Sequence, residues 1–443
     1  MSTIKKNKLS LNKILSVVFL FYIFYLPRIT DLLFNILSQY VIIILCFVLA
    51  IFRLDNIFKE NTNASISKKA LVEWSIKIIF LSAYTALIAL FNNYNSRFFQ
   101  YIYIILWILT LYWFKKIVLD KYFSNKEILE IILWFGVIQG IICIIMLISP
   151  SAKEIANSLC FLNEKRNIFR MEKRIFGISN DYTFFTPCYH GFLSSLCILY
   201  SIIENKKFIL AFPFIFLATF LNNRTGIIIC AINIFVICLF ILFDKEINPH
   251  IKINVLKVFF SIIVFLSVIL ILIKTFNPKN FMYTINGIFS AREWVDEQDS
   301  QWYFPEGISF VFGTGEVQAG VSRRKMGLSM DLISDFGYVN DMFIGGIVYC
   351  IGLYISNFRF VLTMHKKKIF HGKMLYFDII MIITLLISNY KGQSMKSGFL
   401  ITALFFIKLV LLDYIDERDN KNEKINLPDD NLQREQRFSE NRC

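Results

Sequence analysis

Charged residues are scarce in this chain. They make up 18% of its 443 residues, and hydrophobic residues make up 56%, whereas a soluble globular protein carries about 25% charged residues. Runs of roughly 18 or more apolar residues recur along the sequence, and each is long enough to cross a ~30 Å hydrocarbon core. The scarcity of charge excludes a soluble domain, and the apolar runs predict an all-α polytopic membrane protein.

The charges that are present are mainly basic. The net charge is +14 and the isoelectric point is about 9.2. Nucleic-acid binding does not follow from this excess, because no soluble domain carries a basic patch interleaved with aromatic residues. Lysine and arginine residues that flank membrane helices explain most of it. No signal-peptide cleavage pattern follows the first apolar run, so we expect that run to be a retained helix.

Disulfide and metal chemistry have little support in the sequence. The nine cysteines fall mainly inside apolar runs, and no CxxC motif is present, so we expect them to be small buried side chains. The predicted outside loops hold no cluster of metal-ligating residues. We therefore expect neither a metal site nor a cofactor.

The apolar runs predict twelve membrane spans, with ten or eleven as an alternative because three of them are short. Their approximate bounds are 12–26, 32–52, 71–91, 98–114, 128–148, 182–203, 208–221, 226–243, 255–275, 338–360, 374–388 and 398–412. Residues 1–412 then form a single transmembrane domain.

Basic loops set the expected orientation. The N-terminal arm and every second loop after it are rich in lysine, as in "KKIVLDKYFSNK", "ENKK" and "HKKKIFHGK". Such short basic loops belong on the cytoplasmic side, which places both termini in the cytoplasm. The charge-mixed segment 413–443 is expected to be a disordered tail.

Two long loops, 149–181 and 276–337, then lie on the outside. Both carry basic residues against the usual bias, which favours an anionic ligand. These residues are Lys165, Arg166, Arg170, Lys173 and Arg174 in the first loop, and Arg292, Arg323, Arg324 and Lys325 in the second.

Several of these residues are candidates for anion binding. Arg166, Arg170 and Arg174 are spaced four apart, so a helix would place them on one face, where they could bind phosphate or lie on lipid head groups. Arg224 sits in a very short outside turn, "FLNNRTGII", where it either snorkels to the interface or has a functional role.

The second loop contains "SAREWVDEQDSQWYFPEGISFVFGTGE", residues 290–316. Gly313 and Gly315 permit a turn with positive φ, in which backbone N–H groups can converge on an anion. Asp335, Gly337 and Tyr338 mark the place where this loop meets the membrane again.

The order of four segments resembles the Wzy-type polysaccharide polymerases, within a wider group that includes the O-antigen ligases. The segments are "R..FGISNDYTFFTPCYHGFLSSL", "NNRTGIII", "AREW…GISFVFGTGE" and "SDFGYVNDMFIGGIVY". The resemblance covers roughly residues 170 to 355, and the flanking helices match only in hydropathy.

The resemblance implies a GT-C-like fold in the bacterial inner membrane and a site on the periplasmic face. Donor and acceptor would be oligosaccharides linked to undecaprenyl pyrophosphate, in contact with membrane lipids and with a chain-length regulator as a further partner. Arg224 and Arg292 match the two arginine positions of the wider group and would neutralise the pyrophosphate leaving group. Trp294 and Trp302 would stack on sugar rings, or pack in a core.

The sequence departs from the ligase pattern because loop 276–337 contains no histidine, and this favours polymerase over ligase. His190 alone lies near the outside, as a helix-interface residue or a functional group. Asp335 falls close to the place of the ligase histidine. It is a candidate general base, or else the N-cap of the tenth span.

A flippase for the same lipid-linked sugars is the main alternative function. Such transporters place charged residues inside their helices around a cavity. The predicted spans, by contrast, are nearly free of charge, with Glu73 and Lys77 near a span end. No inverted repeat is visible either, so the polymerase is favoured over the flippase and over a structural or sensor protein.

Overall fold

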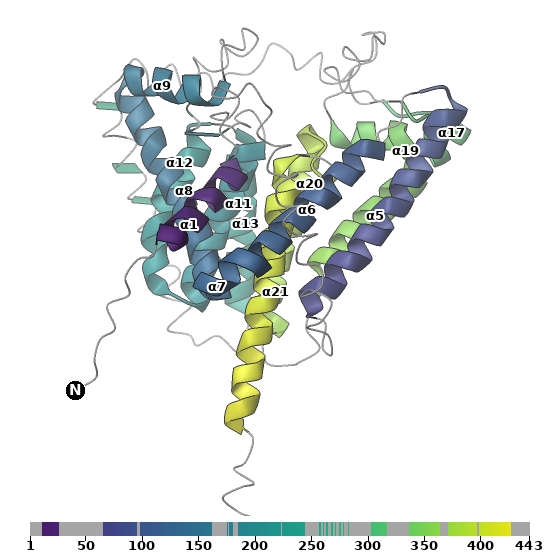
Figure 1. The fold of residues 1–443 in the computed structure, drawn as a ribbon. Coiled ribbons are helices and arrows are strands. Elements are labelled where there is room, and N and C mark those ends of the chain that lie inside the picture. Colours follow the sequence, from purple (N-terminus) through teal and green to yellow (C-terminus); the bar gives the residue numbers. More distant parts are fainter. Residues whose placement is uncertain are drawn as a thin grey trace, which may run out of the picture.

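The computed structural model describes residues 11–25, 65–94, 98–161, 175, 177–179, 185–222, 224–243, 303–316, 336–363, 371–396 and 398–426, with isolated positions between 257 and 282. All its elements there are helices (Figure 1). They are α1 (Leu11–Tyr25), α5 (Ile66–Phe91), α6 (Phe98–Phe114), a π-helical turn (Lys115–Leu119), α7 (Asp120–Tyr122), α8 (Asn125–Ile148), α9 (Pro150–Phe161), α11 (Phe185–Ile203), a 3₁₀ turn (Lys206–Ala211), α12 (Phe212–Phe220), α13 (Arg224–Phe243), α17 (Ile308–Phe312), α19 (Gly337–Val361), α20 (His371–Lys391) and α21 (Phe399–Asn426).

Continuous apolar sequence and local capping explain these helices. Ser124 accepts a hydrogen bond from the backbone N–H of Glu127, whose carboxylate accepts one from the backbone N–H of Ser124, and this capping box begins α8. Six of the described helices are long and apolar enough to cross a membrane. The chain is therefore a helical membrane protein.

Helices occupy ten of the twelve predicted span positions. The predicted span 32–52 lies outside the described residues, and only scattered positions of 255–275 are described. The predicted span 208–221 differs from the expectation, because it consists of a 3₁₀ turn followed by the nine-residue helix α12. The predicted outside loop 149–181 also differs, since it opens with helix α9.

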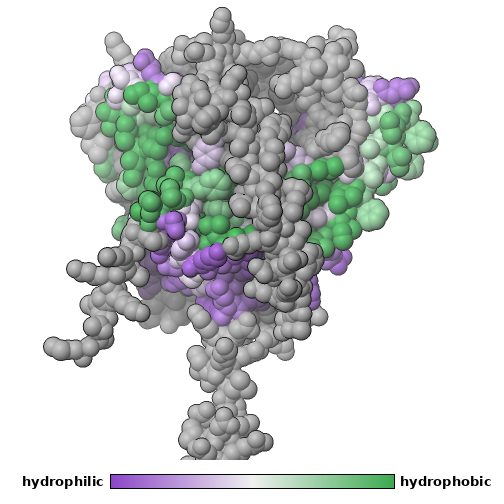
Figure 2. All heavy atoms as spheres, in the orientation of Figure 1, coloured by the Kyte–Doolittle hydropathy of each residue, from purple (hydrophilic) through white to green (hydrophobic). Residues whose placement is uncertain are grey.

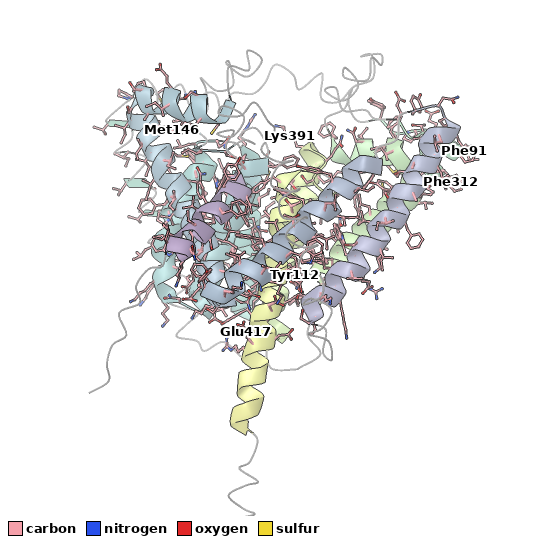
Figure 3. The ribbon with its side chains drawn as sticks, viewed as in Figure 1. Phe91, Tyr112, Met146, Phe312, Lys391 and Glu417 are labelled. Carbon is pink, nitrogen blue, oxygen red and sulfur yellow. The ribbon has the colours of Figure 1, made fainter. Side chains whose placement is uncertain are left out.

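The bundle has two distinct ends. The basic end is where α5 and α8 begin and α6 and α11 finish, and polar residues gather there (Figure 2). At the opposite end, which we call the loop end, lie Phe91, Met146, Phe312 and Lys391 (Figure 3). The lysine-rich connections at 115–126 and 204–207 share the basic end, as the alternation of basic loops predicts.

Helix α21 forms the central column of the bundle. It packs against α5, α6, α8 and α11 and stands between the two groups of helices (Figure 1). Every residue from Leu400 to Asp413 is buried. A helix that is apolar on all sides is suited to such a central position.

Three ion pairs are distributed along this column. Lys396, just before α21, pairs with Asp341 of α19. Lys408 pairs with Asp378 of α20 at 2.6 Å, and both side chains are fully buried. The expectation of nearly charge-free spans was therefore wrong. Asp341, Asp378 and Lys408 lie within predicted spans, and each is neutralised by a partner on another element.

The third pair belongs to a network at the basic end. Asp413 accepts hydrogen bonds from Lys115 at 2.6 Å and from Ser67 at 2.6 Å, and Lys116 lies 2.9 Å away. Asp120 lies 3.0 Å from Lys115. These contacts join α5, α6 and α21. Helix α21 then continues to Asn426, so the segment predicted as a disordered tail begins as helix.

Removing one member of the central pair should destabilise the protein strongly. Asp378→Leu leaves the Lys408 ammonium buried without its partner, which costs about 3–5 kcal/mol. The double variant Asp378→Leu/Lys408→Leu should recover most of this loss, and unfolding in detergent would measure both. As a control, Glu73→Ala, which breaks the partly exposed Glu73–Lys77 pair, should cost less than about 1 kcal/mol. A double variant as unstable as the single one would contradict the expectation.

The orientation predicts a labelling pattern at exposed residues. Cysteine placed at Glu154 of α9 should react with an impermeant maleimide in intact spheroplasts. Cysteine at Lys121, at the basic end, should react only after the membrane is permeabilised. The reverse pattern would invert the topology.

Candidate functional site

A buried ion pair lies beneath the loop end. The Lys396 ammonium contacts Asp341 Oδ1, and both side chains have no exposed surface. Asp341 Oδ2 accepts hydrogen bonds from Tyr354 at 2.7 Å and from the Asn389 side chain at 3.0 Å. Since the carboxylate has donors on both oxygens, its burial is compensated.

The turn between α20 and α21 holds Lys396 in place. The backbone N–H of Met395 donates to Asn389 Oδ1 at 3.2 Å, and the Met395 carbonyl accepts from the Asn357 side chain at 2.8 Å. The Lys396 ammonium also lies 6.0 Å from the centre of the Tyr349 ring, whose hydroxyl contacts that of Tyr101. Residues from α6, α19, α20 and the turn thus form one buried polar cluster, which we call the Asp341 cluster.

Helix α19 is interrupted beside this cluster. Gly346 has φ of 66° and ψ of −169°, so the helix breaks there. In a regular helix the carbonyl of Phe343 would accept from residue 347. It accepts instead from the backbone N–H groups of Thr314 at 2.7 Å and Gly315 at 3.0 Å.

The Gly313–Gly315 turn therefore seals the break in α19. Both glycines have positive φ, 81° and 77°, as predicted. Their turn does bring N–H groups together, but the groups converge on the Phe343 carbonyl and not on an anion. The expectation of an anion-binding turn was wrong here, because the broken helix supplies a protein acceptor.

The start of α19 packs tightly on α20. A side chain at Gly337 would meet the Gly392 carbonyl, and the Tyr338 hydroxyl donates to the Leu386 carbonyl at 2.7 Å. The N-cap of α19 is Phe336, which makes no side-chain capping bond. The alternative prediction that Asp335 is the N-cap of this span was therefore wrong by one residue.

Arg224 and its neighbours form a second group at the loop end. Arg224 begins α13 and is exposed. Asn222, two residues earlier, is 1% exposed, and neither its amide nitrogen nor its oxygen has a partner among the described residues. Ile175 lies against this turn, since its N–H donates to the Leu221 carbonyl at 3.2 Å. Ile178 is bonded to the Gln139 side chain of α8 at 2.6 and 2.8 Å.

His190 lies inside the bundle. It is fully buried, and its Nε2 is 3.0 Å from the Tyr25 hydroxyl. The centres of the Tyr25 and Tyr189 rings lie 5.7 Å and 5.9 Å from the centre of the His190 ring. Its position fits the helix-interface role, and Nδ1 lacks a partner among the described residues.

The remaining predicted site residues lie in parts of the chain that the structure does not describe. Those outside the described residues are Arg166, Arg170, Arg174, Arg292, Trp294, Trp302 and Asp335. Within the described part, no three histidine, cysteine or acidic side chains cluster as a metal site would require. Seven cysteines are described, and six of them are buried.

Sequence analysis missed Asp341 and Lys396. Asp341 lies within "SDFGYVNDMFIGG", and Lys396 lies in "NYKGQSMKSG", a short connection at the loop end. That connection carries Lys391 and Lys396 without an acidic residue, so it was a third basic segment on the outside face. This excess was the signal that could have identified the cluster.

Comparisons with known proteins add no relative. No family model, no curated protein and no solved structure matches the chain.

Because the Gly313–Gly315 turn packs into the break in α19, we expect Gly346→Ala to destabilise the protein. The new Cβ would meet the Val311 carbonyl oxygen, and this backbone conformation, which is essentially restricted to glycine, costs another residue about 1–3 kcal/mol. Thermal unfolding in detergent should therefore shift to lower temperature. Gly352→Ala in the same helix is the matched control, because it meets only a methyl group of Leu81. Equal stability of the two variants would argue against the seal.

Proposed function

We propose that the chain is a glycosyltransferase that polymerises undecaprenyl-pyrophosphate-linked oligosaccharide repeat units at the periplasmic face of the bacterial inner membrane. The glycan on one lipid carrier would be transferred to the non-reducing end of the repeat unit on another. The product would be an O-antigen or a capsular polysaccharide.

The pairing of the motif segments carries this proposal. Ile175 of the first segment donates a hydrogen bond to Leu221, in the turn that leads into Arg224 of the second. Thr314 and Gly315 of the third segment donate backbone hydrogen bonds to the Phe343 carbonyl of the fourth. Four segments that were selected only for their order along the chain thus associate in two pairs, both at the loop end. A chance resemblance gives no reason for such pairing.

The described residues around Arg224 suit a pyrophosphate. A cation at a helix N-terminus is disfavoured by the positive end of the helix dipole, so Arg224 does not stabilise α13 there. The same dipole and the guanidinium both attract an anion, and the guanidinium can form forked hydrogen bonds to phosphate oxygens. The unpaired amide of buried Asn222 adds a further donor and acceptor close by.

Asp335 and Arg292 keep their proposed roles as general base and second phosphate ligand. The tight packing of Gly337 and Tyr338 on α20 supports the role of Asp335, because it holds the start of α19 in one position. A carboxylate two residues before this point would be held at the membrane surface, where an acceptor hydroxyl could give up its proton.

A flippase for lipid-linked oligosaccharides is the second candidate, and the buried charges favour it. Asp341, Lys396, Asp378 and Lys408 lie within the bundle, as expected of transporters. Each of these charges is paired with an opposite charge, so the pairs also fit a structural role. Cells without the protein would separate the candidates: loss of a polymerase leaves surface lipid capped with one repeat unit, whereas loss of a flippase leaves none.

Arg224 gives the sharpest test of the proposed chemistry. Arg224→Ala should lower the polymerisation rate about 10²–10³-fold, the usual effect of losing one stabiliser of transition-state charge. Arg224→Lys should restore only part of it, because a point charge cannot reproduce the fork. Polymer ladder length at matched protein level is the measurement.

Arg359→Ala is the matched control, because Arg359 is an exposed arginine at the basic end, and its ladder should be normal. A wild-type ladder from Arg224→Lys would show that Arg224 only anchors the chain among lipid head groups, where either cation is worth about 1 kcal/mol.

A further inference from the structure

An apolar surface extends from α5 onto the short helix α17. On α17, Ile308 is 77% exposed, Phe312 48% and Phe310 41%. At the end of α5, Phe91 is 84% exposed and Leu90 68%. Phe91 and Phe312 lie on the same flank of the molecule (Figure 3). Exposed apolar side chains on a loop that is predicted to face water require an explanation.

The depth of α17 follows from its contacts with two membrane helices. The Tyr84 hydroxyl of α5 donates to the carbonyls of Phe312 at 3.3 Å and Gly345 at 3.1 Å. Tyr84 lies seven residues before the end of α5, or about 10 Å at 1.5 Å per residue. Gly345 lies eight residues into α19, or about 12 Å. The end of α17 therefore lies deeper in the bundle than the last residue of α5 and the first residue of α19.

The length of α5 places this level inside the membrane. Its 26 residues span about 39 Å, roughly 9 Å more than the hydrocarbon core. If the excess is shared between the two ends, Tyr84 is about 6 Å inside the hydrocarbon boundary. The α17 segment then has hydrocarbon on its free side.

Several backbone groups of the segment are bonded to protein, as such a position favours. Irregular backbone at membrane depth must have its polar groups satisfied by protein. The Gly313 N–H donates to the Ser309 carbonyl, and Thr314 and Gly315 donate to the Phe343 carbonyl. The Phe312 carbonyl accepts from Tyr84, and the Glu316 N–H donates to the Thr314 hydroxyl.

We infer that residues 306–316 form a re-entrant segment, in which α17 inserts into the membrane from the loop end and its apolar side chains contact lipid acyl chains. Glu306 and Glu316 bracket the segment, which places one ionisable residue at each of its ends. The continuity with the lipid-facing residues of α5 identifies the occupant as bilayer lipid. The inference replaces the outside placement of these residues and stands independently of the proposed function.

A nitroxide label can measure whether the side chains of α17 contact lipid or water. p-Acetylphenylalanine would be incorporated at Phe310 and at Phe312 and coupled to a hydroxylamine nitroxide, with the native cysteines in place. The protein would be reconstituted in phosphatidylethanolamine and phosphatidylglycerol vesicles free of polyprenyl lipid. Collision with oxygen, which concentrates in hydrocarbon, would be compared with collision with the water-soluble nickel chelate. Labels at Phe80 of α5, which is 72% exposed and lies deeper than Tyr84, and at Lys121 are the lipid and water references.

The expected result is an oxygen-to-nickel ratio at Phe310 and Phe312 that approaches the ratio at Phe80 and is several-fold above that at Lys121. A ratio like that at Lys121 would overturn the inference. Labels shielded from both reagents would show protein on this surface and would also overturn it. Labels that become shielded from nickel only after undecaprenyl phosphate is added would assign the surface to a polyprenyl chain instead of bilayer lipid.

Discussion

The cost of burying charge in a low-dielectric bundle constrains this structure most. Helix α21 and the turn before it carry Lys396, Lys408 and Asp413, and each is paired with a charge on another element. A lysine that is deprived of its carboxylate there would be strongly unfavourable. Each pair therefore links α21 to one neighbour: α19 near the loop end, α20 midway, and the end of α6 at the basic end. Dispersion packing alone, which dominates between membrane helices, would not specify these partners so narrowly.

A second constraint acts on the backbone. Within the membrane a free carbonyl has no water to bond, so a broken helix must be repaired by protein. The break at Gly346 is repaired by a turn that lies about thirty positions earlier in the chain, and Tyr84 of α5 adds its hydroxyl. The long loop is consequently attached to the bundle at a fixed depth. Its position at this point does not depend on a ligand.

Hydropathy was sufficient to predict much of the fold, because a membrane span is a local property of the sequence. The apolar runs matched helices at ten of twelve positions. Charge pairs are not local: Asp341 and Lys396 are 55 residues apart, and Lys115 and Asp413 are 298 apart, so no window along the chain could associate them. The positive φ of Gly313 and Gly315 was predictable from residue type, but their partner, Phe343, depended on a helix break that hydropathy does not reveal. Arg224 was correctly predicted to lie at the start of a span, since it begins α13.

The central position of α21 has a consequence for how the protein is made. The ribosome delivers about 5–20 residues per second, N-terminal first, and α21 follows every other described helix in the chain. Lys115 must therefore remain about 15–60 seconds without Asp413, which is synthesised 298 residues later. Asp378 waits only a few seconds for Lys408, 30 residues on. During the longer interval the end of α6 lacks this carboxylate, and among the described residues Asp120 is the carboxylate that remains in contact with Lys115. The nascent chain thus reaches a compact bundle only in the last stage of its biosynthesis.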